Sequence, residues 1–127
     1  MPKFDRLQIE ALKEYLYYSY VHDSKIDTLG YDKEKKNLVI ELVNPIFGDR
    51  ICLSFEKVKV VLSISGNEFE NGETIISLTA EEDYSYLQNC TGVCVDNLFD
   101  YIYLLFQMFS GNELHIVCEK VFIEIVK

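Results

Sequence analysis

The chain has 127 residues, of which 49% are hydrophobic and 26% are charged, and its formal net charge is −9. This length is typical of one domain of roughly 100–150 residues, and the composition excludes disordered, collagen-like and coiled-coil chains. The negative charge disfavours direct binding to nucleic acid or to an anionic membrane surface, because both would repel the chain.

The first predicted element is an amphipathic helix over residues 5–20. Apolar side chains recur there at steps of three and four residues, and Asp5 stands where a helix N-cap belongs. The triplet His22-Asp23-Ser24 ends this helix. It contains the residue types of a catalytic triad, but adjacent residues on an extended chain point apart. We therefore expect Asp23 or Ser24 to bond nearby backbone instead.

Short alternating segments follow the helix and predict about six or seven antiparallel strands. Residues 25–32 lead into a polar turn at 33–37. The strands expected after this turn cover residues 38–43, 51–55, 58–64, 101–109, 114–118 and 121–125, with residues 74–78 as a possible further strand.

The segment between residues 79 and 109 permits more than one reading. Thr79 and Glu82 fit a capping box, which predicts a short helix near residues 81–88. Tyr, Ile and Phe dominate residues 101–109 and favour a strand, but Asp96 could instead cap a helix that runs through Phe109. Because no linker or repeat interrupts the chain, residues 1–127 are expected to form one α+β domain. In this fold the N-terminal helix packs on a mostly antiparallel, twisted sheet.

The N-terminal residues lack the apolar core and the cleavage site of a signal peptide. The longest apolar stretches, such as residues 101–106, are far shorter than a membrane span. We therefore expect a cytoplasmic protein that has reduced cysteines, does not contact nucleic acid directly and does not associate with a membrane.

The acidic residues are distributed unevenly along the chain. Residues 1–59 hold ten acidic and ten basic side chains, which cancel, whereas residues 60–119 hold ten acidic side chains and no Lys or Arg. Carboxylates around exposed aromatic rings suit a basic protein partner, because charge steers the encounter and aromatic side chains supply buried anchors. The alternative is a solvated acidic face that only aids solubility, with Phe69 in the core. The predicted partner-binding residues are Glu68, Phe69, Glu70, Glu73, Glu81, Glu82, Asp83, Tyr84 and Tyr86.

Four residues have the chemistry of zinc ligands, namely Cys90, Cys94, His115 and Cys118. Their spacing is looser than that of structural zinc sites, and the odd separation of His115 and Cys118 on one strand points them to opposite faces. A packing role is therefore the preferred interpretation, and no metal or cofactor is expected. The acidic triplet at 81–83 could bind a hard cation, but the EF-hand pattern is missing.

Tyrosines crowd the end of the first predicted helix, at positions 15, 17, 18 and 20. Their spacing wraps around the helix, so they cannot all face one core. Exposed aromatic side chains often mark an interface, which makes a homodimer through this end of the helix the alternative to plain core packing.

Several segments resemble a known group of proteins in outline. These are His22–Ile26, Tyr31-Asp32, Leu38–Leu42, Ile51–Val58 and the closing Gly111–Val121. The chain is similar over residues 22–64 and 103–125 to small bacterial cytosolic domains, some of them assigned as immunity proteins of polymorphic toxin systems. The resemblance implies an α+β domain that binds a toxin, and it supplies no catalytic motif. Residues 66–98 lie outside it and are a sensible place for partner specificity.

The sequence as a whole favours a non-enzymatic protein-binding domain. We expect an immunity protein that blocks the active cleft of a basic toxin domain with acidic side chains from residues 68–86. The alternatives are a small hydrolase or ligand-binding domain with a pocket between helix and sheet, and a structural homo-oligomer. An enzyme is less favoured, because the motifs of serine hydrolases, zinc proteases and P-loop proteins are missing.

Overall fold

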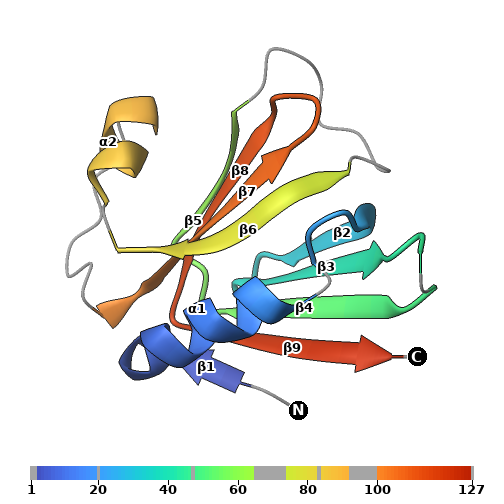
Figure 1. Ribbon diagram of the computed structural model, residues 1–127. Coiled ribbons are helices and arrows are strands. Elements are labelled where there is room, and N and C mark those ends of the chain that lie inside the picture. The colour runs from blue at the N-terminus through green and yellow to red at the C-terminus, as the bar shows by residue number, and fades with distance from the viewer. Residues whose placement is uncertain are drawn as a thin grey trace.

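Two antiparallel sheets face each other across the core of the computed structural model, which describes residues 3–19, 21–46, 48–64, 74–82, 84–91 and 100–126 (Figure 1). The five-stranded sheet has the order β1-β9-β4-β3-β2, and the four-stranded sheet has the order β5-β8-β7-β6. The five strands of the first sheet are β1 (Lys3–Asp5), β2 (Lys25–Asp32), β3 (Asn37–Val43), β4 (Arg50–Glu56) and β9 (Lys120–Val126). The second sheet contains β5 (Val60–Ile64), β6 (Ile75–Glu81), β7 (Ile102–Met108) and β8 (Glu113–Cys118).

The α+β class is as predicted, but the sheet count is not. The described residues form nine strands in two sheets, whereas the sequence predicted about six or seven strands in one sheet. Strand β1 has only three residues, too few to show an alternating pattern. Strand β2 exposes nearly all of its side chains and buries Ile26, so hydrophobicity gives it little signal. A period of two shows which side chains share a face and leaves open which strands pair.

The main core lies between the two sheets. Alternate residues of β3 and β4 are buried there, as their alternating sequence predicted. The rings of Phe55 on β4 and Phe106 on β7 meet across this core with centroids 6.3 Å apart. These two residues are fully buried, so the contact joins the two sheets directly.

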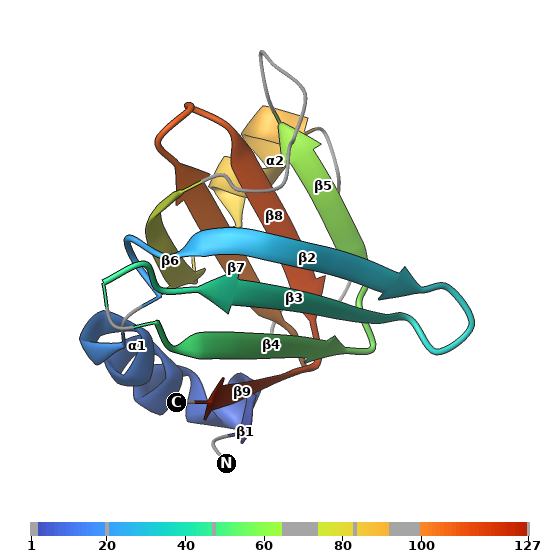
Figure 2. The same cartoon turned by 90° about the vertical axis from the view of Figure 1, so that its right-hand side faces the viewer.

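The N-terminal helix begins as predicted at Asp5. The Asp5 carboxylate accepts from the backbone N–H of Leu7, and the Gln8 side chain accepts from the backbone N–H of Asp5. A 3₁₀ turn over Arg6–Gln8 then leads into α1 (Ile9–Tyr18). Figure 2 shows α1 beside both sheets, where it contacts β6 and β1. Its buried residues Ile9, Leu12 and Leu16 join the main core.

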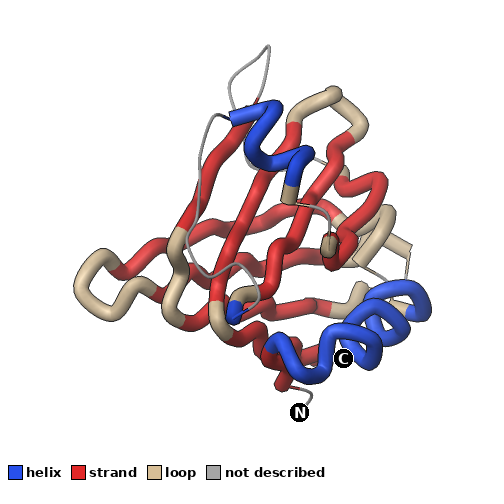
Figure 3. Tube along the Cα trace, turned by 90° about the vertical axis from the view of Figure 1, so that its left-hand side faces the viewer, coloured by secondary structure: helices blue, strands red, loops and turns tan. Residues whose placement is uncertain are grey.

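The second helix, α2 (Ser85–Thr91), lies over the outer face of the four-stranded sheet (Figure 3). It begins later than the predicted 81–88, because Glu81 still belongs to β6. A second cluster fills the space beneath it and contains Tyr84, Leu87, Tyr103, Leu105 and Val117. Strand β7 is therefore buried on both faces over most of its length. This two-sided burial explains why residues 101–109 are almost wholly apolar or aromatic.

The strand interpretation of residues 101–109 is confirmed, since β7 pairs with both β6 and β8. A tight turn joins β7 to β8, in which Gly111 has a φ of 90° that L side chains rarely adopt.

Upstream, Asp23 also has a positive φ, of 68°, and its N–H donates to the carbonyl of Ile75. The described part of the chain contains no helix that is long and apolar enough to cross a membrane.

Candidate partner-binding surface

The acidic part of the sequence forms one half of the molecule. The four-stranded sheet and α2 come from one contiguous segment, residues 60–118, and the chain then returns through β9 to pair with β4. Figure 1 shows the four-stranded sheet and α2 above the five-stranded sheet. Because residues 60–119 contain no Lys or Arg, every basic side chain except those at the border belongs to the other half. The described four-stranded sheet and α2 thus carry acidic side chains and no Lys or Arg.

The structure describes four of the predicted partner-binding residues, Glu81, Glu82, Tyr84 and Tyr86. All four lie where β6 ends and α2 begins. The other five lie outside the described residues, namely Glu68, Phe69, Glu70, Glu73 and Asp83. The described part of the site is therefore the β6–α2 connection.

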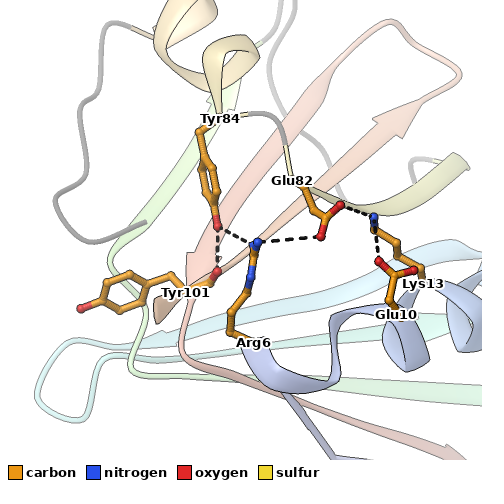
Figure 4. Close-up of polar contacts among 6 residues, drawn as sticks. All are labelled: Arg6, Glu10, Lys13, Glu82, Tyr84 and Tyr101. Atoms are coloured by element: carbon orange, nitrogen blue, oxygen red, sulfur yellow. Dashed lines mark hydrogen bonds and ion pairs between the residues drawn. The ribbon is translucent and has the colours of Figure 1, made fainter. Parts of the chain in front are cut away.

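Glu82 is held by two cations from the N-terminal segment (Figure 4). Lys13 Nζ lies 2.8 Å from Glu82 Oε2, and Arg6 Nη2 lies 3.8 Å from Glu82 Oε1. The hydrogen bond from Lys13 to Glu82 raises the pKa of Lys13 and lowers the pKa of Glu82. This exposed carboxylate is therefore paired with cations of the same chain.

Tyr84 is a packing residue. It is only 7% exposed, and its ring stacks on Tyr103 with centroids 5.7 Å apart. Its hydroxyl donates to the carbonyl of Tyr101 at 2.7 Å and accepts from Arg6 Nη1 at 3.2 Å (Figure 4). Burial raises the pKa of the Tyr84 hydroxyl. Tyr84 is thus not an exposed aromatic anchor, and it ties the β6–α2 connection to β7 and to the N-terminal segment.

Glu81 and Tyr86 also reach the surface, as Glu82 does. Glu81 is half-buried and accepts from the Thr79 hydroxyl at 2.8 Å. Tyr86 is 39% exposed, and its hydroxyl donates to Glu113 Oε2 at 2.6 Å. Asp100, two residues before β7, is also exposed. It is one of the ten acidic residues of 60–119 and was not among the predicted contacts.

A buried chain of polar side chains lies under α2. Tyr103 and His115 are both 0% exposed, and the Tyr103 hydroxyl lies 2.6 Å from His115 Nδ1. His115 Nε2 lies 3.3 Å from Glu113 Oε1, and the Tyr86 ring stacks on the imidazole at 5.8 Å. Burial alone would raise the pKa of Glu113, but hydrogen bonds from Tyr86, His115 and Gln107 lower it.

These contacts join Glu113, His115 and Tyr103 in that order. A general base must reach a substrate, whereas His115 and Tyr103 have no exposed surface. Sequence reasoning missed the network because its members share a face only through the pairing of β7 with β8. The network satisfies the polar groups that α2 buries.

The zinc hypothesis finds no support in the described residues. His115 contacts Tyr86 and Tyr103 on the outer face of β8, whereas Cys118 lies in the main core on the opposite face. Both ring nitrogens of His115 already have partners, and burial raises the pKa of the Cys118 thiol well above its usual range. The described residues contain no group of three potential metal ligands. The Cys90 side chain and Cys94 lie outside the described part of the structure.

Comparison with known proteins gives no assignment, because no protein-family model matches the chain and no curated protein is significantly similar to it. The resemblance to immunity domains therefore stays a prediction from the sequence pattern. The case for a function depends on the geometry and the charge of this molecule alone.

Proposed function

We propose that this chain is a non-enzymatic protein-binding domain of the immunity type, which holds a basic toxin domain against its acidic half. One observation carries the proposal. Residues 60–118 form a separate sheet with its own covering helix, and this half has no Lys or Arg of its own. A surface with one sign of charge favours encounter with a partner of the opposite sign and repels others.

Only some of the acidic residues are available to such a partner. Glu82 and Glu119 form ion pairs with Lys13 and Lys57, and Glu113 accepts hydrogen bonds from Tyr86 and lies beside His115. Asp100 is exposed and has no ion pair among the described residues. We therefore assign the contact to Asp100 and Glu81, together with the predicted residues Glu68, Phe69, Glu70, Glu73 and Asp83.

The proposed mechanism is occupation of a basic cleft. Many toxin domains act on nucleic acid, and a cleft that binds phosphates is lined with cations. Carboxylates of the acidic half would take the place of the phosphates, and half-exposed Tyr86 would supply apolar contact area at the rim. This role needs no catalytic group, which is consistent with the burial of the Glu113–His115–Tyr103 chain.

The test begins with capture of the partner by the tagged protein from its native host at low and moderate salt, followed by mass spectrometry. The proposal requires recovery of a basic protein whose toxicity is relieved when the two are co-expressed. Association rates are then measured for two triple variants that change the net charge equally. E68K/E70K/D100K alters the acidic half, and E34K/D49K/E124K alters the half that contains the five-stranded sheet.

We expect the first triple variant to slow association at least tenfold at low salt, because steering by opposite charge accounts for roughly 10–10³ in on-rate. The second triple variant should change the rate much less. Recovery of no basic partner, or equal effects of the two variants, would overturn the proposal.

A further inference from the structure

A groove of about 500 Å³ lies between α1 and the end of β9, away from the acidic half. Helix α1 contributes Glu14, Tyr15 and Tyr18, β1 contributes Phe4, and β9 contributes Ile125. This volume lies within the roughly 300–1,000 Å³ that is usual for small-molecule sites. Such sites combine apolar and aromatic walls with a few polar groups, which is the composition found here.

Three aromatic rings line this groove. Phe4 and Tyr15 meet at 5.5 Å with their planes inclined by 50°, so together they form a corner. The third ring is Tyr18, which is 74% exposed and makes an edge contact with Tyr17 at 5.0 Å. Burial raises the pKa of the Tyr15 hydroxyl. Tyr20, the last of the four clustered tyrosines in the sequence, lies outside the described residues.

Glu14 gives the groove a negative charge. Its side chain is exposed, and among the described residues it forms no ion pair. The neighbouring cation Lys13 is directed to Glu82 and Glu10 instead (Figure 4). An uncompensated carboxylate beside three aromatic rings attracts a cation, and the rings favour one with an apolar surface.

From this arrangement we infer that the groove binds a small organic cation with an alkylated ammonium head group. The aromatic rings hold the head group by cation–π attraction, and Glu14 supplies the opposite charge. An alkylated ammonium suits the groove better than a bare ammonium, because it is less strongly hydrated and places apolar surface against the aromatic rings. This site is independent of the proposed protein-binding surface, since the two use different parts of the molecule.

The test uses choline and its uncharged isostere 3,3-dimethylbutan-1-ol as probes. Each is titrated into isotopically labelled protein at constant ionic strength, and backbone amide shifts are followed by NMR. Exposed cation–π contacts correspond to dissociation constants in about the millimolar range, so the titration extends to about 50 mM. We expect choline to shift the amides of residues 14–19 and 125, and the neutral isostere to bind at least several-fold more weakly.

Two variants and two matched controls locate the site. Y18L removes one ring and keeps an apolar side chain, and E14Q removes the charge and keeps the shape. Each should weaken choline binding about two- to fivefold, the change that one exposed cation–π or ion contact gives. The controls Y31L and E34Q alter exposed residues far from the groove on β2 and in the β2–β3 turn.

Three results would overturn the inference. They are no saturable shift up to about 50 mM choline, equal binding of the neutral isostere, and equal effects of the site variants and the controls. Retained amide spectra of Y18L and E14Q show whether the variants are folded. Because neither probe involves a protein partner, failure here leaves the proposed function unaffected.

Discussion

The buried contact between Tyr103 and His115 gives the sharpest prediction about stability. The carboxylate of Glu113 can only accept, so His115 Nε2 carries a proton toward it, and in the tautomer with this proton alone Nδ1 accepts from the Tyr103 hydroxyl. The substitution Tyr103→Phe removes the hydroxyl that donates to Nδ1. Both residues are 0% exposed. The ring itself and its stacking on Tyr84 are retained.

The expected cost follows from this burial. A buried polar atom that loses its partner destabilises a protein by about 1–3 kcal/mol, because water cannot replace the missing hydrogen bond. For a domain of this size each kcal/mol lowers the melting temperature by about 3–6 °C. The control Tyr31→Phe alters an exposed hydroxyl on β2 and should change the free energy of unfolding by less than about 0.5 kcal/mol.

Urea unfolding followed by circular dichroism measures both variants, with the slope of the transition as a check that the unfolded states are comparable. The double variant Y103F/H115L should be less destabilised than the sum of its single variants by about 1 kcal/mol, since neither partner is then left unsatisfied. Strict additivity, or a change below about 0.3 kcal/mol for Y103F, would refute the argument that this hydrogen bond is buried and coupled.

Two further predictions use other groups of the same sheet. The folded state lowers the pKa of Glu113, so its contribution to stability is present above the ordinary value of 4.5 and is lost as the pH falls through the folded pKa. Urea unfolding between about pH 7 and pH 3 should therefore show a steeper loss for the wild type than for E113Q, and parallel curves would contradict this. The Cys118 thiol is 0% exposed with a raised pKa, so iodoacetamide should alkylate it only at the rate of unfolding and more slowly than half-buried Cys52. Peptide mass spectrometry measures both rates, and equal labelling of the folded protein would show that Cys118 is accessible.

The sequence predicted local features well where they depend on neighbours in the chain. The Asp5 cap needs only the next three residues, and the alternation in β3 and β4 needs only a period of two. Strand β7 was recognisable because it is buried on both faces and therefore selects aromatic and branched residues. These patterns can be recognised in the sequence without knowing which strands pair.

Features that depend on strand pairing were not predictable from the sequence. Strand β9 pairs with β4 across more than sixty residues of chain, as in the pair Glu56 and Lys120, and this pairing divides the strands into two sheets. Contacts between residues far apart in the sequence also shape the candidate site. Glu82 was predicted as a partner contact because no cation is near it in sequence, but Lys13 reaches it across 69 positions. Tyr84 is an aromatic residue among acidic ones, which is the pattern expected of an exposed anchor. Its burial follows from the packing of α2 over β7.

The ion pairs at the junction of the two halves determine where the negative field of this protein is strongest. Lys13 and Arg6 neutralise Glu82, and Lys57 neutralises Glu119, at the places where the acidic half meets the rest of the chain. Such exposed pairs contribute little to stability, and their main effect is to reduce the uncompensated negative charge at this junction. Interactions beyond about 10 Å are screened at 0.1 M salt. Binding of a basic protein to many acids should therefore weaken steeply with ionic strength, whereas binding of an alkylated ammonium beside the single carboxylate of Glu14 should depend on it only weakly. Salt dependence thus separates the two proposed sites without any substitution.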